Sequence, residues 1–150
     1  MPSLPGAILF ACNLNRVRSP MAAGLMRRLF GGRVFVDSCG LRRGLDEGAD
    51  PFAVAVMDEL GVDLARHHAK TFADLEDDSF DIVISLTPEA HHRALEMGRL
   101  RSVEITYWPT FDPTLVCGAR ETVLDAYRGV RDTLEARILE RFPHVRTFGG

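Results

Sequence analysis

Long hydrophobic runs are missing from the 150-residue sequence. No stretch approaches the roughly 20 apolar residues that a membrane-spanning helix needs, so we expect no contact with a membrane. The first residues lack the basic-then-apolar pattern of a secretory signal, and we therefore expect a cytoplasmic protein. Repeats, low-complexity tracts and long linkers are also absent. A chain of this length suits one hydrophobic core, so we expect a single domain over residues 1–150.

Cysteine is scarce, and the three cysteines Cys12, Cys39 and Cys117 cannot all pair with one another. No two of them have the close spacing of a zinc knuckle or a redox pair. A disulfide framework is also unusual for a cytoplasmic chain of this size. The histidines and carboxylates form no cluster with metal-ligand spacing. The sequence therefore predicts no metal, no cofactor and at least one free thiol.

Lysine is nearly absent, and the positive charge gathers in arginines early in the chain. Between Cys12 and Gly44 lie seven arginines and one acid, Asp37, although the whole chain carries a net charge of −3. The seven are Arg16, Arg18, Arg27, Arg28, Arg33, Arg42 and Arg43. A local positive field on an otherwise acidic protein suits a small anionic ligand better than nucleic acid. For the outer arginines, a solvated helix face is an equally good explanation.

Four apolar runs have the near-continuous hydrophobicity of strands buried on both faces of a parallel sheet. They cover residues 7–11, 33–37, 81–86 and 103–108. The helical patterns cover residues 20–30, 51–60, 88–97 and 120–141, with a short helical piece at 71–77. Strands that alternate with helices predict an α/β three-layer sandwich, with a four-stranded parallel sheet of flavodoxin-like order 2-1-3-4 and helices on both faces. In that order, ligands bind at the carboxyl end of the first strand.

Helix boundaries are marked by capping residues that precede a proline. These pairs are Ser19-Pro20, Asp50-Pro51 and Thr87-Pro88. Ser, Asp and Thr side chains accept hydrogen bonds from the first turn of a helix, and proline is favoured at its first position. Glycines that follow helices, at Gly31 and Gly61, suit a left-handed ending.

The loop between the first strand and the first helix begins at Cys12 and ends at Arg18. Such a loop directs backbone N–H groups to one point, and the helix dipole adds positive potential there. The planar guanidinium of Arg18 can hold two phosphate oxygens at once. The same field stabilises a Cys12 thiolate, which is a nucleophile. The alternative is a buried structural cysteine in an arginine-flanked turn. We predict a phosphate-binding loop that consists of Asn13, Leu14, Asn15, Arg16, Val17 and Arg18.

The run from Cys12 to Pro20, which ends in Arg18-Ser19-Pro20, resembles the signature of the low-molecular-weight protein tyrosine phosphatases. Further segments resemble this family in the right order along the chain. They are Val36-Asp37-Ser38, Gly61-Val62-Asp63 followed by His67, Phe80-Asp81-Ile82-Val83, and Asp112-Pro113. The resemblance implies a phosphatase that forms a phosphocysteine intermediate and acts on a phosphorylated protein or a small phosphate ester.

By this resemblance, Cys12 is the nucleophile, Arg18 binds the phosphoryl oxygens, and Asp112 is the general acid and then the general base. A mobile carboxylate can serve in both roles, because it first gives a proton to the leaving oxygen and then takes one from water. Residues implied to support the loop are Asn15, Ser19, Ser38 and His67. From the residues alone, Asp112 would be part of an ordinary Asp-Pro turn and His67 a surface histidine.

The sequence departs from the family pattern at several positions. Leu14 replaces a usual glycine, which predicts a strained or reshaped loop. Val17 replaces a frequent second cysteine, so that Cys12 lacks a redox partner. Arg16 adds a cation to the loop. Thr114-Leu115-Val116 replaces a tyrosine-rich segment. Tyr107, Trp108 and Phe111 can supply a different aromatic wall or pack in the core at the strand end.

Two other functions remain open. The first is an inactive oxyanion-binding module whose loop holds phosphate but does not support turnover. The second is arsenate reduction, since related reductases share this fold and loop. Those reductases need further cysteines near the helix after the third strand, and residues 88–97 contain none.

Overall fold

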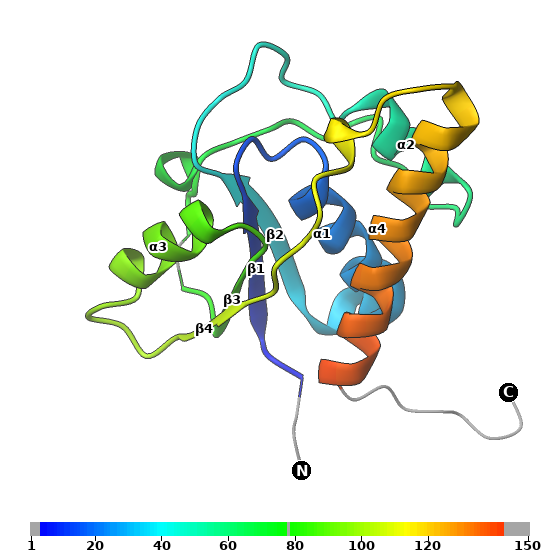
Figure 1. Cartoon of the computed structure of the whole chain (residues 1–150). Coiled ribbons are helices and arrows are strands. Elements are labelled where there is room, and N and C mark those ends of the chain that lie inside the picture. Colours follow the sequence, from blue (N-terminus) through cyan, green and yellow to red (C-terminus); the bar gives the residue numbers. More distant parts are fainter. Residues whose placement is uncertain (1–3, 78, 143–150) are drawn as a thin grey trace, which may run out of the picture.

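The computed structural model describes residues 4–77 and 79–142, which contain a sheet of four parallel strands (Figure 1). The strands are β1 (Ala7–Cys12), β2 (Phe35–Gly40), β3 (Ile82–Ser85) and β4 (Glu104–Tyr107). Their order in the sheet is β2-β1-β3-β4, and every neighbouring pair is parallel. The predicted sheet order is therefore confirmed.

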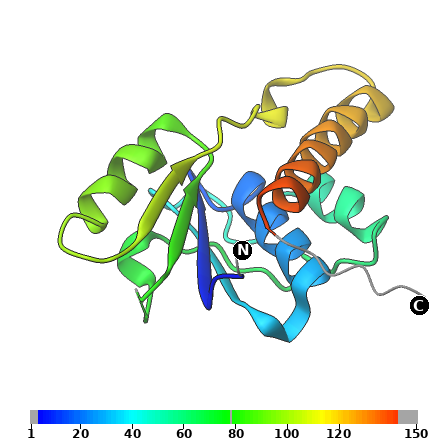
Figure 2. The ribbon, with the colours of Figure 1, turned by 90° about the horizontal axis from the view of Figure 1, so that it is seen from below.

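Helices cover both faces of this sheet. In the described part of the chain the α-helices are α1 (Arg18–Phe30), α2 (Pro51–Asp58), α3 (Pro88–Met97) and α4 (Arg120–Arg141). The helices α1, α2 and α4 lie on one side, and α3 covers the other side (Figure 2). The predicted three-layer sandwich is therefore confirmed. None of the helices in residues 4–77 and 79–142 is long and apolar enough to span a membrane.

The central strand β1 is buried on both faces. Ile8, Phe10 and Cys12 face the core beneath α1 and α4, whereas Leu9 and Ala11 face the core beneath α3. All five are at most 3% exposed. Successive side chains of a strand alternate between its faces. Cys12 therefore projects on the α1 side, at the carboxyl end of the strand, where α1 begins.

Three short 3₁₀ helices complete the described elements, at Gly31–Arg33 (η1), Phe72–Asp74 (η2) and Pro113–Leu115 (η3). The sequence predicted a helical piece over residues 71–77, but the structure has only the single turn of η2 there. Thr71 and Asp74 form a capping box at the start of this turn, and the turn ends at Leu75, whose backbone is extended. The second strand was predicted two residues too early, because η1 continues the turn after α1.

Two of the three predicted caps are confirmed. Asp50 Oδ1 accepts a hydrogen bond from Phe52 N (2.8 Å), and Thr87 Oγ1 accepts one from Ala90 N (3.1 Å). The third was wrong: α1 begins at Arg18, and no side chain caps it. Ser19 instead lies inside the first turn, where its hydroxyl is free to contact the preceding loop.

Candidate active site

Cys12 ends β1 at the base of the loop, and its side chain is only 3% exposed. Its Sγ lies 2.9 Å from the Oγ of Ser19 in the first turn of α1. The Ser19 hydroxyl also lies 3.3 Å from the carbonyl oxygen of Cys39 and can donate to it. A hydroxyl has one proton, so Ser19 can donate to only one of these partners at a time. It can therefore turn to donate to the sulfur when Cys12 is ionised.

Asn15 is the centre of the hydrogen bonds beneath the loop. It is fully buried, and its φ of 58° is in the left-handed region that asparagine tolerates better than most residues. Its Nδ2 donates to Ser19 Oγ (2.8 Å) and Ser38 Oγ (2.9 Å), while its Oδ1 accepts from Lys70 N (3.0 Å). One amide thus joins α1, β2 and the segment after α2 to the loop.

His67 contacts the same residue from another direction. Its Nε2 lies 2.7 Å from the carbonyl oxygen of Asn15, and the side chain is half-buried. Burial lowers the pKa of His67, while the contact with this carbonyl opposes that effect. A neutral imidazole with its proton on Nε2 donates to the carbonyl. The structure therefore places His67 against the loop rather than free on the surface.

Gly40 is a site residue that the sequence analysis missed. A Cβ at this position would lie 2.8 Å from both the carbonyl oxygen of Asn13 and the amide nitrogen of Asn15. Real Cβ atoms do not approach backbone atoms so closely, so the loop needs glycine here. The sequence did contain a signal for this role, because Gly40 lies just after the predicted second strand, close to the point where ligands bind in this sheet order.

The loop also meets the sheet through Asn13, whose Oδ1 accepts a hydrogen bond from Thr87 Oγ1 (2.8 Å). Thr87 is the cap of α3, so the loop is held from both sides of the sheet. Arg16 and Val17 have backbone N–H groups without an acceptor among residues 4–77 and 79–142. These donors remain available to a ligand.

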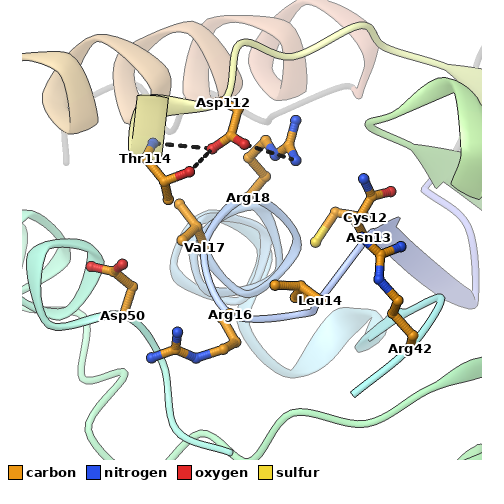
Figure 3. A pocket seen from close by; sticks show the side chains of 10 residues that line it. All are labelled: Cys12, Asn13, Leu14, Arg16, Val17, Arg18, Arg42, Asp50, Asp112 and Thr114. Atoms are coloured by element: carbon orange, nitrogen blue, oxygen red, sulfur yellow. Dashed lines mark hydrogen bonds and ion pairs between the residues drawn. The ribbon is translucent and has the colours of Figure 1, made fainter. Parts of the chain in front are cut away.

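Arg18 and Asp112 come from distant parts of the chain and meet at the cavity (Figure 3). Arg18 Nη1 donates to the carbonyl oxygen of Thr110 (3.1 Å), and Nη2 lies 3.9 Å from Asp112 Oδ2. The other carboxylate oxygen of Asp112 accepts from Thr114 N (3.0 Å) and Thr114 Oγ1 (2.6 Å). One oxygen of Asp112 is thus held by η3, and the other faces the Arg18 side.

The cavity above Cys12 has a volume of about 150 Å³. Its lining consists of Cys12, Asn13, Leu14, Arg16, Val17, Arg18, Arg42, Asp50, Asp112 and Thr114. Arg42 and Asp50 were not predicted for the site. None of the three aromatic residues considered from the sequence lines this cavity. Trp108 packs near Phe10, with 6.3 Å between the ring centroids, Tyr107 stacks on His91, and Phe111 is exposed.

The predicted strain at Leu14 was wrong. Among the described residues, Asn15 is the only one other than glycine with a positive φ, so Leu14 needs no glycine-like backbone. Its side chain lies beneath Gly44, where a Cβ would be 3.5 Å from Leu14 Cδ1. Leucine therefore fits the loop without backbone strain.

The three cysteines are free. Cys39 lies in the core beneath α3, on the face of the sheet opposite Cys12, and burial raises the pKa of its thiol. Cys117 is exposed in the segment that follows η3. Within residues 4–77 and 79–142, no group of three or more His, Cys, Asp and Glu side chains is arranged to hold a metal ion.

The fold and the loop together define an α/β protein with a cysteine and an arginine around an oxyanion-sized cavity at the switch point of the sheet. Comparison with known families identifies the family that has this fold and loop. The family described as "Low molecular weight phosphotyrosine protein phosphatase" matches residues 7–145. The chain therefore belongs to this family.

Individual relatives carry different activities in their names. The chain is 35% identical over 79 residues to "Glutaredoxin arsenate reductase" of Synechocystis sp., a match that covers 53% of this chain and 58% of that relative, less than two thirds. It is 28% identical to "Low molecular weight protein-tyrosine-phosphatase Wzb" of Escherichia coli strain K12, over 89% and 88% of the two chains. The solved "YwlE arginine phosphatase from Geobacillus stearothermophilus" has 26% identity and a TM-score of 0.70, covering 94% of this chain and 100% of that chain.

Proposed function

We propose that this chain is a cysteine-dependent phosphatase that hydrolyses a phosphate monoester through a phosphocysteine intermediate. One observation carries the proposal: Cys12 lies at the base of a small cavity that Arg18 and Asp112 also line. Attack on phosphorus needs a nucleophile, a positive group on the phosphoryl oxygens and an acid at the leaving oxygen. These three residues can supply one each.

In the first step, the Cys12 thiolate attacks phosphorus while the bond between phosphorus and the ester oxygen breaks. Arg18 and the backbone N–H groups of the loop bind the phosphoryl oxygens and stabilise the charge of the transition state. Asp112, in its protonated form, gives its proton to the leaving oxygen. The products are a phosphocysteine, an alcohol or phenol, and an ionised Asp112.

In the second step, the Asp112 carboxylate takes a proton from a water molecule that attacks the phosphocysteine. The sulfur–phosphorus bond breaks, inorganic phosphate forms, and the thiolate returns. The Ser19 hydroxyl, 2.9 Å from Cys12 Sγ, supports both steps because it can donate to the sulfur anion. Asn15, Ser38 and His67 have positioning roles, since they hold the loop and Ser19 without lining the cavity.

The experiment is a steady-state assay with p-nitrophenyl phosphate at mildly acidic pH. The wild-type chain turns over, Cys12→Ser is inactive, and Asp112→Ala is slowed with a flatter pH profile. Cys39→Ser is the matched control, because its thiol faces the other core. A screen of phosphotyrosine, phosphoarginine and small phosphate esters then finds the substrate class. Activity that survives Cys12→Ser would refute the proposal.

Arsenate reduction is the second candidate, because relatives such as the Synechocystis protein carry that name. Reduction of arsenate to arsenite oxidises two thiols to a disulfide, so a second thiol must act with Cys12. In this chain Cys39 is buried on the opposite face of the sheet, and Cys117 is exposed outside the lining of the cavity. We therefore expect no arsenate-dependent oxidation of thioredoxin or glutaredoxin. The absence of backbone strain at Leu14 also argues against the inactive oxyanion-binding module.

A free thiol nucleophile fits the reducing cytoplasm, which we propose as the location.

A further inference from the structure

The segment that follows β2 lies beside the phosphate-binding loop (Figure 1, residues 41–50 in cyan). Arg42 N donates to the carbonyl oxygen of Asn13 (3.1 Å), and Arg16 Nε donates to the carbonyl oxygen of Gly48 (2.8 Å). Asp50 N in turn donates to the carbonyl oxygen of Arg16 (2.9 Å). The backbone of Arg42 is therefore held at a defined position relative to the loop, although its side chain is exposed.

Arg16 and Arg42 both line the cavity, and Figure 3 shows them on either side of Leu14. Among residues 4–77 and 79–142, no carboxylate lies within 4 Å of either guanidinium. The neighbouring Arg43 differs, because its Nη2 lies 2.7 Å from Asp74 Oδ2 and its Nη1 lies 3.9 Å from Glu47 Oε1. Arg42 therefore keeps its charge available for a ligand, whereas the guanidinium of Arg16 donates to Gly48 and is directed toward Asp50 (Figure 3).

The two carboxylates of the cavity have partners of their own, and neither forms an ion pair with Arg42. Asp112 is held by the backbone and hydroxyl of Thr114. Asp50 caps α2, and its Oδ2 accepts a hydrogen bond from the hydroxyl of Tyr127 (3.1 Å). Both carboxylates come from elements outside the segment that carries Arg42.

We propose that Arg42 forms a subsite for a second anionic group of the substrate. The inference rests on the proposed function and names its substrate class: phosphate monoesters that carry a carboxylate or a second phosphate beside the reacting ester. Arg18 takes the transferred phosphoryl group, so Arg42 is left for the other anion. A guanidinium matches the planar pair of oxygens that both of these groups present.

A binding experiment tests the subsite without relying on turnover. The probes are phenyl phosphate and 3-carboxyphenyl phosphate, which differ by one carboxylate, and the protein is Cys12→Ser, studied by isothermal titration calorimetry. We expect the carboxylate to tighten binding about three- to fivefold, the upper range for an exposed ion pair. Adding Arg42→Gln abolishes the preference, and added salt reduces it. Arg43→Gln, the matched loss of a paired arginine, retains it.

The source of the second anion is tested with the active chain. Phosphotyrosine peptides that carry glutamate or alanine on either side of the phosphotyrosine are compared by kcat/KM. A glutamate preference that depends on Arg42 indicates an acidic protein substrate, and a preference only for the small carboxylate indicates a small molecule. Equal binding of the two phenyl phosphates, or a preference that survives Arg42→Gln, overturns the subsite. Binding without hydrolysis refutes only the phosphatase, whereas absence of binding refutes both proposals.

Discussion

Replacement of Asn15 by alanine tests whether the network beneath the loop holds the site together. The substitution removes hydrogen bonds to Ser19, Ser38 and Lys70, all from a fully buried amide. At about 1 kcal/mol net for each bond, the loss is about 3 kcal/mol. Alanine also tolerates the φ of 58° less well than asparagine, which adds about 1 kcal/mol. The free energy of unfolding should therefore fall by about 4 kcal/mol.

The assay is urea unfolding followed by circular dichroism, with p-nitrophenyl phosphate turnover measured on the same samples. For a chain of this length, the loss corresponds to a melting temperature lower by roughly 10 °C. Turnover should fall at temperatures where the variant is still folded, because Ser19 loses the donor that orients it.

Asn15→Gly separates the side chain from the backbone. Glycine adopts a positive φ without strain but makes none of the side-chain hydrogen bonds. It should lose the same bonds as alanine. Because the strain of alanine, about 1–2 kcal/mol, exceeds the cost of the unfolded-state freedom of glycine, about 0.5–1 kcal/mol, it should still be about 0.5–1 kcal/mol more stable than Asn15→Ala. A loss below about 1 kcal/mol for Asn15→Ala would refute the network argument. A glycine variant less stable than the alanine variant would refute the argument from backbone strain.

Three further outcomes follow from the site. Gly40→Ala places a Cβ 2.8 Å from two backbone atoms of the loop, so kcat/KM should fall at least about tenfold and stability by about 1–3 kcal/mol; unchanged kinetics would show that the loop yields easily. Leu14→Gly should not speed turnover and should cost at least about 0.5–1 kcal/mol in urea unfolding, because glycine adds unfolded-state freedom and also removes a partly buried side chain. A faster variant would contradict the absence of strain. The lowered pKa of His67 means that the unfolded chain binds its proton first, so acidification below about pH 6.5 costs stability. His67→Gln should lose less stability than wild type between pH 7.5 and pH 5.5, and parallel curves would remove His67 from the acid response.

The secondary structure was predictable where the chain carries local signals. The capping residues Asp50 and Thr87 mark helix starts because their side chains bond to amides only two or three residues away. The error at Ser19 has the same local origin, because a Ser-Pro pair looks like a cap whether or not the helix has already begun. The helical piece at 71–77 is too long because the capping box of Thr71 and Asp74 marks where a helix starts but not how far it continues.

The candidate site was predictable only in part. Cys12 and Arg18 belong to one loop, so their spacing could be read directly, and Asp112 entered through a family resemblance. Arg42 and Asp50 were missed because nothing in their own neighbourhood shows that they line a cavity. The strain expected at Leu14 is absent, because the left-handed position of the loop is Asn15, and residue types alone do not show which residue of a loop has a positive φ.

The sequence by itself determined that a cysteine lies at the end of a buried strand and that an arginine ends the short loop before the next helix, because these features depend on residues close together in the chain. Only the tertiary structure decided which groups surround them. Asn15 meets Ser38, His67 and Lys70 across 23, 52 and 55 residues. Such contacts depend on how strands and helices pack in three dimensions, and local patterns of hydrophobicity do not contain that information.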